Sequence, residues 1–443
     1  MKLNYKRTTL IGLAFMSILA FWQFYDQVIP YLLEVKFGRD VFESKVFMAM
    51  DNVLAVFMLP LFGKLSDVTK TRLGKRTPYI LYGTIASVIL LCVLSYFESV
   101  SNFDGFIIVL MFLLIAMATY RSPAVAYMPD VTEKPLRSKG NAVINLVGYV
   151  GGIFATVVMM FLLKGGEKYV ENGEAKIKYP DDLSFTPVFL IIAAFMLVAV
   201  LVMVFTVKEN KLLAETNIKD EEAVDDNTKK KKLSKSVIVS LVLILSSVLL
   251  WYTAYNGVTT SFSMYCFNVL GIDLGTSSMY LTIATVVAIA SFIPLGMLSS
   301  KIGRKKAVLF GIVLMTACYA AAIFIDAQLV ANAPWLMYII FAVIGIGWAS
   351  INVNSFPMVV EMCTGSDVGK YTGYYYTFSM AAQIVTPILS GWLIKNLSIG
   401  YKVLFPYAVI FSVASFITMC FVRHGDSKPD SKAAIEEQFA ADN

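Results

Sequence analysis

Twelve long apolar stretches, spread along almost the whole chain, constrain the fold more than any other feature. A helix needs about 20 apolar residues to cross the roughly 30 Å hydrocarbon layer of a bilayer. We therefore predict an all-α membrane protein with twelve transmembrane helices. The predicted spans are 9–33, 44–66, 77–97, 105–128, 140–163, 186–207, 237–260, 275–298, 306–326, 334–358, 370–395 and 402–422.

The charge content excludes several classes of protein. Only 15% of the 443 residues are charged, whereas soluble domains carry about 25%. A soluble enzyme, a disordered chain and a nucleic-acid-binding protein are therefore poor interpretations. We expect no cofactor or metal, because the chain has 1 His and its 5 Cys lie in or beside apolar runs without a C-x-x-C pair. The sequence also lacks a Walker loop, so ATP-driven pumping is not predicted.

The positive charges predict the orientation in the membrane. The first apolar stretch contains Asp26 and lacks a cleavage pattern, so we interpret it as a helix rather than a signal peptide. If both termini are cytoplasmic, the inside segments carry roughly three times as many Lys and Arg residues as the outside loops. We expect a multi-pass protein of the plasma or inner membrane, monomeric and surrounded by lipid.

A charged segment divides the spans into six and six. We predict an N-terminal six-helix half at 1–207, a C-terminal half at 237–422 and a cytoplasmic tail at 423–443. The cytoplasmic linker between the halves, 208–236, is interpreted as solvated, with room for a short surface helix. The hydrophilic stretch 164–185 is expected outside, as a small hairpin or loop.

Two motifs repeat six spans apart. Gly63-Lys64-Leu65-Ser66-Asp67 and a basic run follow span 2, and Gly296-Met297-Leu298-Ser299-Ser300 and another basic run follow span 8. Glycine permits close helix approach, so we interpret the motif as a charge-linked latch at a cytoplasmic gate. Anchoring by positive charge alone would explain the basic residues but not the paired Gly and Ser. With a weaker repeat after spans 4 and 10, the gate candidates are Gly63, Asp67, Arg72, Gly74, Arg76, Asp130, Arg137, Gly296, Arg304 and Glu361.

Two six-span halves with corresponding motifs resemble the major facilitator superfamily, whose halves rock about a site near the bilayer midplane. Segments 69–83 and 121–152 resemble the glycoside–pentoside–hexuronide:cation symporters, in particular the branch with the plant sucrose carriers. That resemblance implies cation- or proton-coupled uptake of a sugar, commonly a disaccharide or other glycoside.

Three charges lie deep inside predicted spans, several residues from either end: Asp26, Asp51 and Arg121. A charge at mid-membrane costs about 2.5–3.5 kcal/mol on insertion scales, so such residues usually face a cavity or a partner. We predict that these three couple proton binding to transport, with Asp26 the first candidate. The alternatives are carboxylates that line a wet vestibule and an arginine bonded to backbone carbonyls.

The sequence departs from its relatives at the sodium site of the melibiose carrier. The acidic positions of that site fall on Ala55, Leu59 and Arg121. Too few oxygen ligands remain, so sodium is less expected than a proton. A fixed Arg121 charge in place of a bound cation would give uncoupled, facilitated transport, which stays open.

Sugar recognition needs flat apolar faces for C–H groups and polar groups for hydroxyls. Each aromatic could instead be core or interfacial belt, and each amide could bond a neighbouring helix. A more apolar cavity would fit a drug or organic-ion exporter, and a non-transporting sensor ranks last. The substrate candidates are Trp22, Gln23, Tyr25, Asp26, Tyr120, Arg121, Asn145, Tyr149, Trp251, Tyr255, Asn256, Trp348, Asn352, Tyr375 and Gln383.

Overall fold

The computed structural model describes residues 4–132, 137–164, 166–171, 174–180, 183–220, 235–362 and 368–425. Among these residues, 12 helices are long and apolar enough to cross a membrane, which confirms the predicted number of spans. The helices that carry them are α1 (Tyr5–Tyr31) with its π-helical continuation η1 (Leu32–Lys36), α2 (Val41–Val68), α3 (Thr77–Ser99), α4 (Phe103–Asp130), α5 (Arg137–Leu162), α6 (Thr186–Thr206), α8 (Lys235–Val269), α9 (Leu274–Ile302), α10 (Arg304–Ala322), α12 (Trp335–Glu361), α13 (Val368–Asn396) and α14 (Leu404–Cys420), which the 3-10 turn η4 (Gly400–Val403) precedes.

Short polar side chains begin several of these helices. Asn4, Asp40 and Asn102 each accept a hydrogen bond from a backbone N–H in the first turn of α1, α2 and α4. Such caps satisfy amides that have no partner within the helix. The local sequence therefore fixes where these spans start.

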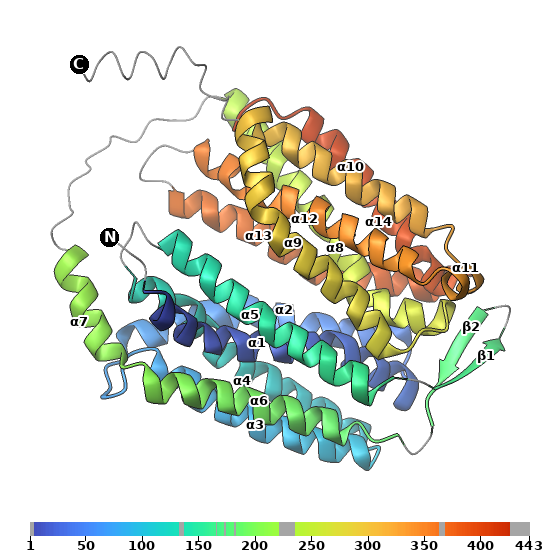
Figure 1. The fold of residues 1–443 in the computed structure, drawn as a ribbon, viewed down its shortest axis with the longest axis horizontal. Helices are drawn as coiled ribbons and strands as arrows, with labels where there is room; N and C mark the ends of the chain where they lie inside the picture. The colour runs from blue at the N-terminus through green and yellow to red at the C-terminus, as the bar shows by residue number, and fades with distance from the viewer. Residues whose placement is uncertain are drawn as a thin grey trace. The chain divides into compact units, whose positions relative to one another are not determined.

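Four smaller elements lie between the spans (Figure 1). Strands β1 (Glu167–Glu171) and β2 (Glu174–Lys178) pair antiparallel, which confirms the expected hairpin. Helix α7 (Glu209–Asp220) is the short helix expected in the linker. Helix α11 (Ala327–Asn332) was not predicted. Among the spans, α8 continues well beyond the predicted range 237–260.

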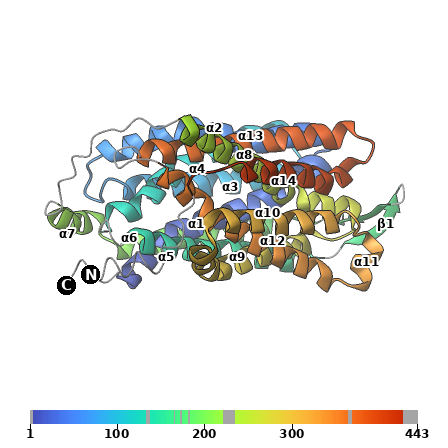
Figure 2. The ribbon, with the colours of Figure 1, turned by 90° about the horizontal axis from the view of Figure 1, so that it is seen from above.

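The chain forms two compact units. Unit 1 comprises Met1–Asp226, Thr260–Thr282 and Pro387–Tyr401; unit 2 comprises Asn227–Thr259, Ile283–Thr386 and Lys402–Asn443. In unit 1, α1 packs against α5 and α6, and α4 packs against α2 and α3. In unit 2, α10 lies beside α12 and α14, as both views of the ribbon show (Figures 1 and 2).

Glycines let the helices approach closely within each unit. A Cβ atom at Gly151 of α5 would lie 2.0 Å from the carbonyl oxygen of Met16 on α1. In unit 2, a Cβ atom at Gly345 of α12 would lie 2.2 Å from the carbonyl oxygen of Ala284 on α9. Tight backbone contact at small residues is a common way for membrane helices to associate.

Candidate functional site

Helix α1 carries a group of polar side chains in its second half. Trp22, Gln23 and Tyr25 each have a buried polar atom: the indole Nε1, the amide Nε2 and the phenol oxygen. None of these three atoms has a hydrogen-bond partner among the residues that the structure describes. Because buried polar atoms are normally paired, this part of α1 offers hydrogen-bonding capacity that the folded chain leaves unused.

Three charges lie around these donors. Asp26 on α1, Asp51 on α2 and Arg121 on α4 interact electrostatically with one another. The Arg121 guanidinium lies 5.2 Å from the centre of the Trp22 ring, and Asn52 donates a 2.7 Å hydrogen bond to the Asp51 carboxylate. Within the described part of the chain, Arg121 forms no direct ion pair with either carboxylate.

A lysine lies close to this group of charges. Lys45 on α2 is fully buried, with 0% of its surface exposed, and its Nζ donates a 2.8 Å hydrogen bond to the Thr260 carbonyl oxygen on α8. It also interacts electrostatically with Asp26 and with Glu34. A Cβ atom at Gly391 of α13 would lie 2.7 Å from the Lys45 Cβ, so α13 packs directly against this side chain.

More polar contacts join early and late parts of the chain within unit 1, at the end where the hairpin lies. We call the bonds described in this paragraph, together with the Lys45–Thr260 bond, the hairpin-end contacts. The Tyr401 hydroxyl donates to the Glu34 carboxylate, and the Ser263 hydroxyl donates to the Gln27 side-chain oxygen. The Leu274 N–H donates to the Tyr179 hydroxyl over 3.0 Å. Together they tie α1 and the hairpin region to α8, α9 and η4.

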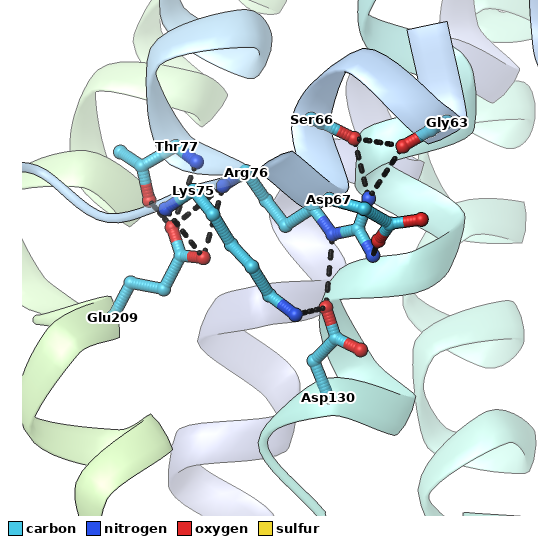
Figure 3. Close-up of polar contacts among 8 residues, drawn as sticks. All are labelled: Gly63, Ser66, Asp67, Lys75, Arg76, Thr77, Asp130 and Glu209. Carbon is cyan, nitrogen blue, oxygen red and sulfur yellow. Dashed lines mark hydrogen bonds and ion pairs between the residues drawn. The ribbon is translucent and has the colours of Figure 1, made fainter. Parts of the chain in front are cut away.

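The opposite end of unit 1, where α2 meets α3, contains the linked charges of the first repeated motif (Figure 3). The Arg76 Nε donates to an Asp130 carboxylate oxygen over 2.9 Å, and Nη1 donates to the Gly63 carbonyl over 3.1 Å. Arg76 also forms an ion pair with Asp67. Lys75 forms a second ion pair with Asp130, at 2.9 Å. The motif therefore joins the ends of α2, α3 and α4.

Glu209, the first residue of α7, completes this network. Its side chain is buried, and its carboxylate accepts from the backbone N–H groups of Lys75, Arg76 and Thr77 at 2.8–3.1 Å and from the Thr77 hydroxyl at 2.8 Å (Figure 3). A carboxylate at the first turn of α3 also complements the helix dipole. The interpretation of 208–236 as solvated is therefore wrong for Glu209.

The second copy of the motif repeats the Ser–Gly contact of the first. The Ser299 hydroxyl donates to the Gly296 carbonyl over 2.9 Å, as the Ser66 hydroxyl donates to the Gly63 carbonyl over 2.8 Å. A Cβ atom at Gly296 would make an ordinary 3.5 Å contact, so close packing does not explain that glycine. Lys305, next to the predicted Arg304 at the start of α10, donates to the carbonyl of Cys420, the last residue of α14, and to the carbonyl of Val422.

Aromatic substrate candidates gather in unit 2. The Tyr255 ring stacks on Trp348 with the ring centres 3.5 Å apart, and Trp251 meets Trp348 edge-on at 5.2 Å. The Asn352 amide donates to the Trp348 carbonyl of its own helix, and the Tyr375 hydroxyl lies 2.9 Å from the Ser355 hydroxyl. The other candidates are buried or half-buried on their helices: Tyr120, Asn145, Tyr149, Asn256 and Gln383.

Comparison with known proteins decides the family. Two overlapping stretches, residues 11–328 and 270–441, match the Major Facilitator Superfamily. The chain belongs to this superfamily. It is therefore a transporter by family, and the prediction of a twelve-helix major facilitator fold is confirmed.

Solved structures agree with the superfamily fold. A bacterial homologue of the iron transporter ferroportin, in an inward-facing state, has a TM-score of 0.68 at 12% identity, covering 95% of this chain and 99% of that one. The nucleoside transporter NupG has a TM-score of 0.66 at 15% identity, covering 94% and 100%. The inward-open xylose transporter XylE from E. coli has a TM-score of 0.65 at 12% identity, covering 98% of both chains. No curated protein matches the sequence.

Apart from Gly296 and Arg304 of the second motif, the gate candidates of this superfamily member divide into three groups. Gly63, Asp67, Arg76 and Asp130 come together, and Gly74 permits the approach of Glu209. Arg72 is exposed, and its backbone carbonyl accepts from Asn210 over 3.1 Å. The side chains of Arg137 and Glu361 lie outside the described residues.

The sequence gives little indication of Lys45 or Glu209. Lys45 lies in the second position of predicted span 44–66, where a lysine ordinarily extends to the membrane surface. Glu209 is the second residue of the predicted linker, and its hydrogen-bond partners lie more than 130 residues earlier in the chain. The only sequence signal for a buried role of Lys45 and Glu209 is that each charge lies at the end of an apolar run.

Proposed function

We propose that this superfamily transporter carries out proton-coupled symport of a sugar, a disaccharide or other glycoside, by alternating access. The observation that carries the proposal is the interacting group of Asp26, Asp51 and Arg121 beside the unused donors of α1. The finer resemblance to the glycoside–pentoside–hexuronide symporters supports the same substrate class.

The charges suit proton coupling because they interact without a direct ion pair. A proton on Asp26 or Asp51 removes a negative charge that acts on Arg121, and a proton on Asp26 also removes one that acts on Lys45. In a medium of low dielectric constant, such a change alters the electrostatic energy of the remaining charges strongly. We propose that protonation of Asp26 thereby favours the conformation that binds or releases the sugar.

The neighbouring side chains suit a polyhydroxylated substrate. The indole of Trp22 offers a flat apolar face and an unused N–H, while Gln23 and Tyr25 offer further buried polar atoms. Aromatic faces with a few convergent polar groups are typical of sites that fix the orientation of a small ligand. The Trp251, Tyr255 and Trp348 cluster is proposed as the corresponding surface in the second half of the chain.

A proposed orientation follows from loop charge. The Arg76 network and both termini would face the cytoplasm, and the hairpin-end contacts would face outside. Alternating access then requires the hairpin-end contacts to break and re-form in each cycle, as the two halves, 1–207 and 237–422, rock.

A second candidate function, facilitated sugar transport without a proton, is favoured by Arg121. This fixed positive charge already interacts with both carboxylates, as a bound cation would. Drug or organic-ion export remains the outcome to consider if no sugar is transported.

The test is uptake of labelled sucrose, maltose and melibiose into proteoliposomes under an inward proton gradient, with and without a protonophore. We expect accumulation of one of these sugars that the protonophore abolishes. Equal downhill entry in both conditions would support the facilitator. Failure to transport any sugar would contradict the proposal and favour export of another class of compound.

A further inference from the structure

A basic cavity lies at the same end of unit 1 as the Arg76 network, apart from the charges of the proposed transport site. Its volume is about 450 Å³. It is formed where α1 begins, where α6 ends and where α7 begins. The residues that line it are Asn4, Lys6, Arg7, Leu10, Thr206, Val207, Lys208, Lys211 and Leu212.

All charged residues that line this cavity are basic. Lys6, Arg7, Lys208 and Lys211 contribute four cations, and none of the lining residues is acidic. The nearest carboxylate in sequence, that of Glu209, already accepts hydrogen bonds from the first turn of α3. Lys6, Lys208 and Lys211 form no ion pair with any carboxylate whose side chain the structure describes.

The backbone strengthens the positive potential. Helix α1 begins at Tyr5 and helix α7 begins at Glu209, so the N-terminal ends of two helices border the cavity. Helix N-termini carry a partial positive charge and unpaired N–H groups that favour anions. The C-terminal end of α6 also borders the cavity and carries a partial negative charge. One such end does not cancel the positive potential of two N-terminal ends.

The position and the lining indicate the kind of anion. Leu10, Val207 and Leu212 give the cavity an apolar side. The first turns of α1 and the last turn of α6 belong to membrane spans, so the cavity lies at the height of the lipid headgroups. Basic pockets between membrane helices at such a boundary are suited to phosphate groups.

We propose that this cavity binds a phosphate group, either that of an anionic glycerophospholipid or that of a small soluble phosphate. Three or four cations and two helix ends would surround the phosphate oxygens, and acyl chains would continue along α1 and α6. Binding there would hold α7 against the end of the helix bundle, next to the Glu209 contacts.

The test measures binding to the purified full-length protein in detergent, by titrated thermal stabilisation. The probes are dihexanoyl-phosphatidylglycerol, dihexanoyl-phosphatidylcholine and inorganic phosphate. The variant is Lys208→Gln/Lys211→Gln. Its matched control is Lys64→Gln/Lys70→Gln, which removes two exposed cations from the same end of unit 1 without touching the cavity.

We expect phosphatidylglycerol to bind the unmodified protein and the control equally, and to bind the cavity variant roughly tenfold more weakly. Phosphatidylglycerol binding much tighter than inorganic phosphate identifies a lipid as the source; equal affinity identifies a soluble phosphate. Equal loss in both variants, equal binding of phosphatidylcholine, or no binding of either phosphate probe overturns the proposal. If the double variant aggregates, Lys6→Gln against Lys64→Gln gives the same comparison.

Discussion

Lys45 interacts both with Asp26, the carboxylate proposed to carry the proton, and with groups at the hairpin end of unit 1. Its ammonium group is buried and bonded to the Thr260 carbonyl, while its charge interacts with Asp26 and Glu34. A buried charge is stable only when partners compensate its lost hydration. Movement of α8 away from α2 would therefore expose Lys45 to a different set of partners.

Replacing Lys45 by an uncharged residue of similar size should show how much its charge, apart from its packing, contributes to stability. We expect Lys45→Met to keep the contact with Gly391 but to lower stability by on the order of 3 kcal/mol, because the half-buried Asp26 and Glu34 carboxylates lose a counter-charge. The measurement is the apparent unfolding temperature in detergent. Lys164→Met, at an exposed lysine, is the control; equal small effects of the two substitutions would contradict the role of Lys45.

Gly74 is needed for its backbone conformation and for its missing side chain. Its φ is +119°, and a Cβ atom would lie 2.1 Å from the Glu209 carboxylate. Gly38 also has a positive φ, +63°, but has open space around it. We expect Gly74→Ala to destabilise the protein by about 2 kcal/mol or more and Gly38→Ala by about 1 kcal/mol. Equal shifts of the unfolding temperature would show that the contact with Glu209 does not matter.

Among the elements, α7 is attached to the start of α3 through its first residue. Glu209 satisfies three backbone N–H groups where α3 begins, which a helix cannot satisfy internally. The linker is therefore attached to the Arg76 network, although its composition is that of a solvated segment.

Removal of this carboxylate should loosen both elements. We expect Glu209→Ala to increase hydrogen exchange of the Lys75–Thr77 amides at least tenfold, because those donors lose their acceptor. Glu43→Ala, at an exposed glutamate in the first turn of α2, should leave these amides unchanged. Unchanged exchange in the Glu209 variant would contradict the capping role.

The sequence predicts elements better than it predicts contacts between them. Twelve spans follow from apolar length alone, and the hairpin follows from polarity. The ion-pair partners Asp67 and Arg76 lie nine residues apart in one motif, so local sequence indicates them. The partners of Lys45 and Glu209 lie on distant helices, and no pattern along the chain encodes those pairings.

For the whole molecule, the hairpin-end contacts make alternating access testable. The side chains of Gln27 and Ser263 touch, and α1 and α8 belong to different proposed halves. In a chain whose 5 native Cys are replaced by alanine, we expect a cross-link between Gln27→Cys and Ser263→Cys to abolish sugar uptake and a reductant to restore it. Uptake that persists in the cross-linked protein would show that this end does not open.

If Asp26 carries the coupled proton, as we propose, sugar transport must move protons across the membrane, and this movement can be measured. Sugar added to proteoliposomes without any imposed gradient should alkalinise the outer medium as protons enter with it. We predict that Asp26→Asn abolishes this signal while exchange of preloaded sugar continues, and that Asp104→Asn, at an exposed carboxylate in the first turn of α4, retains it. Sugar-driven proton uptake that persists in Asp26→Asn would show that Asp26 does not carry the coupled proton.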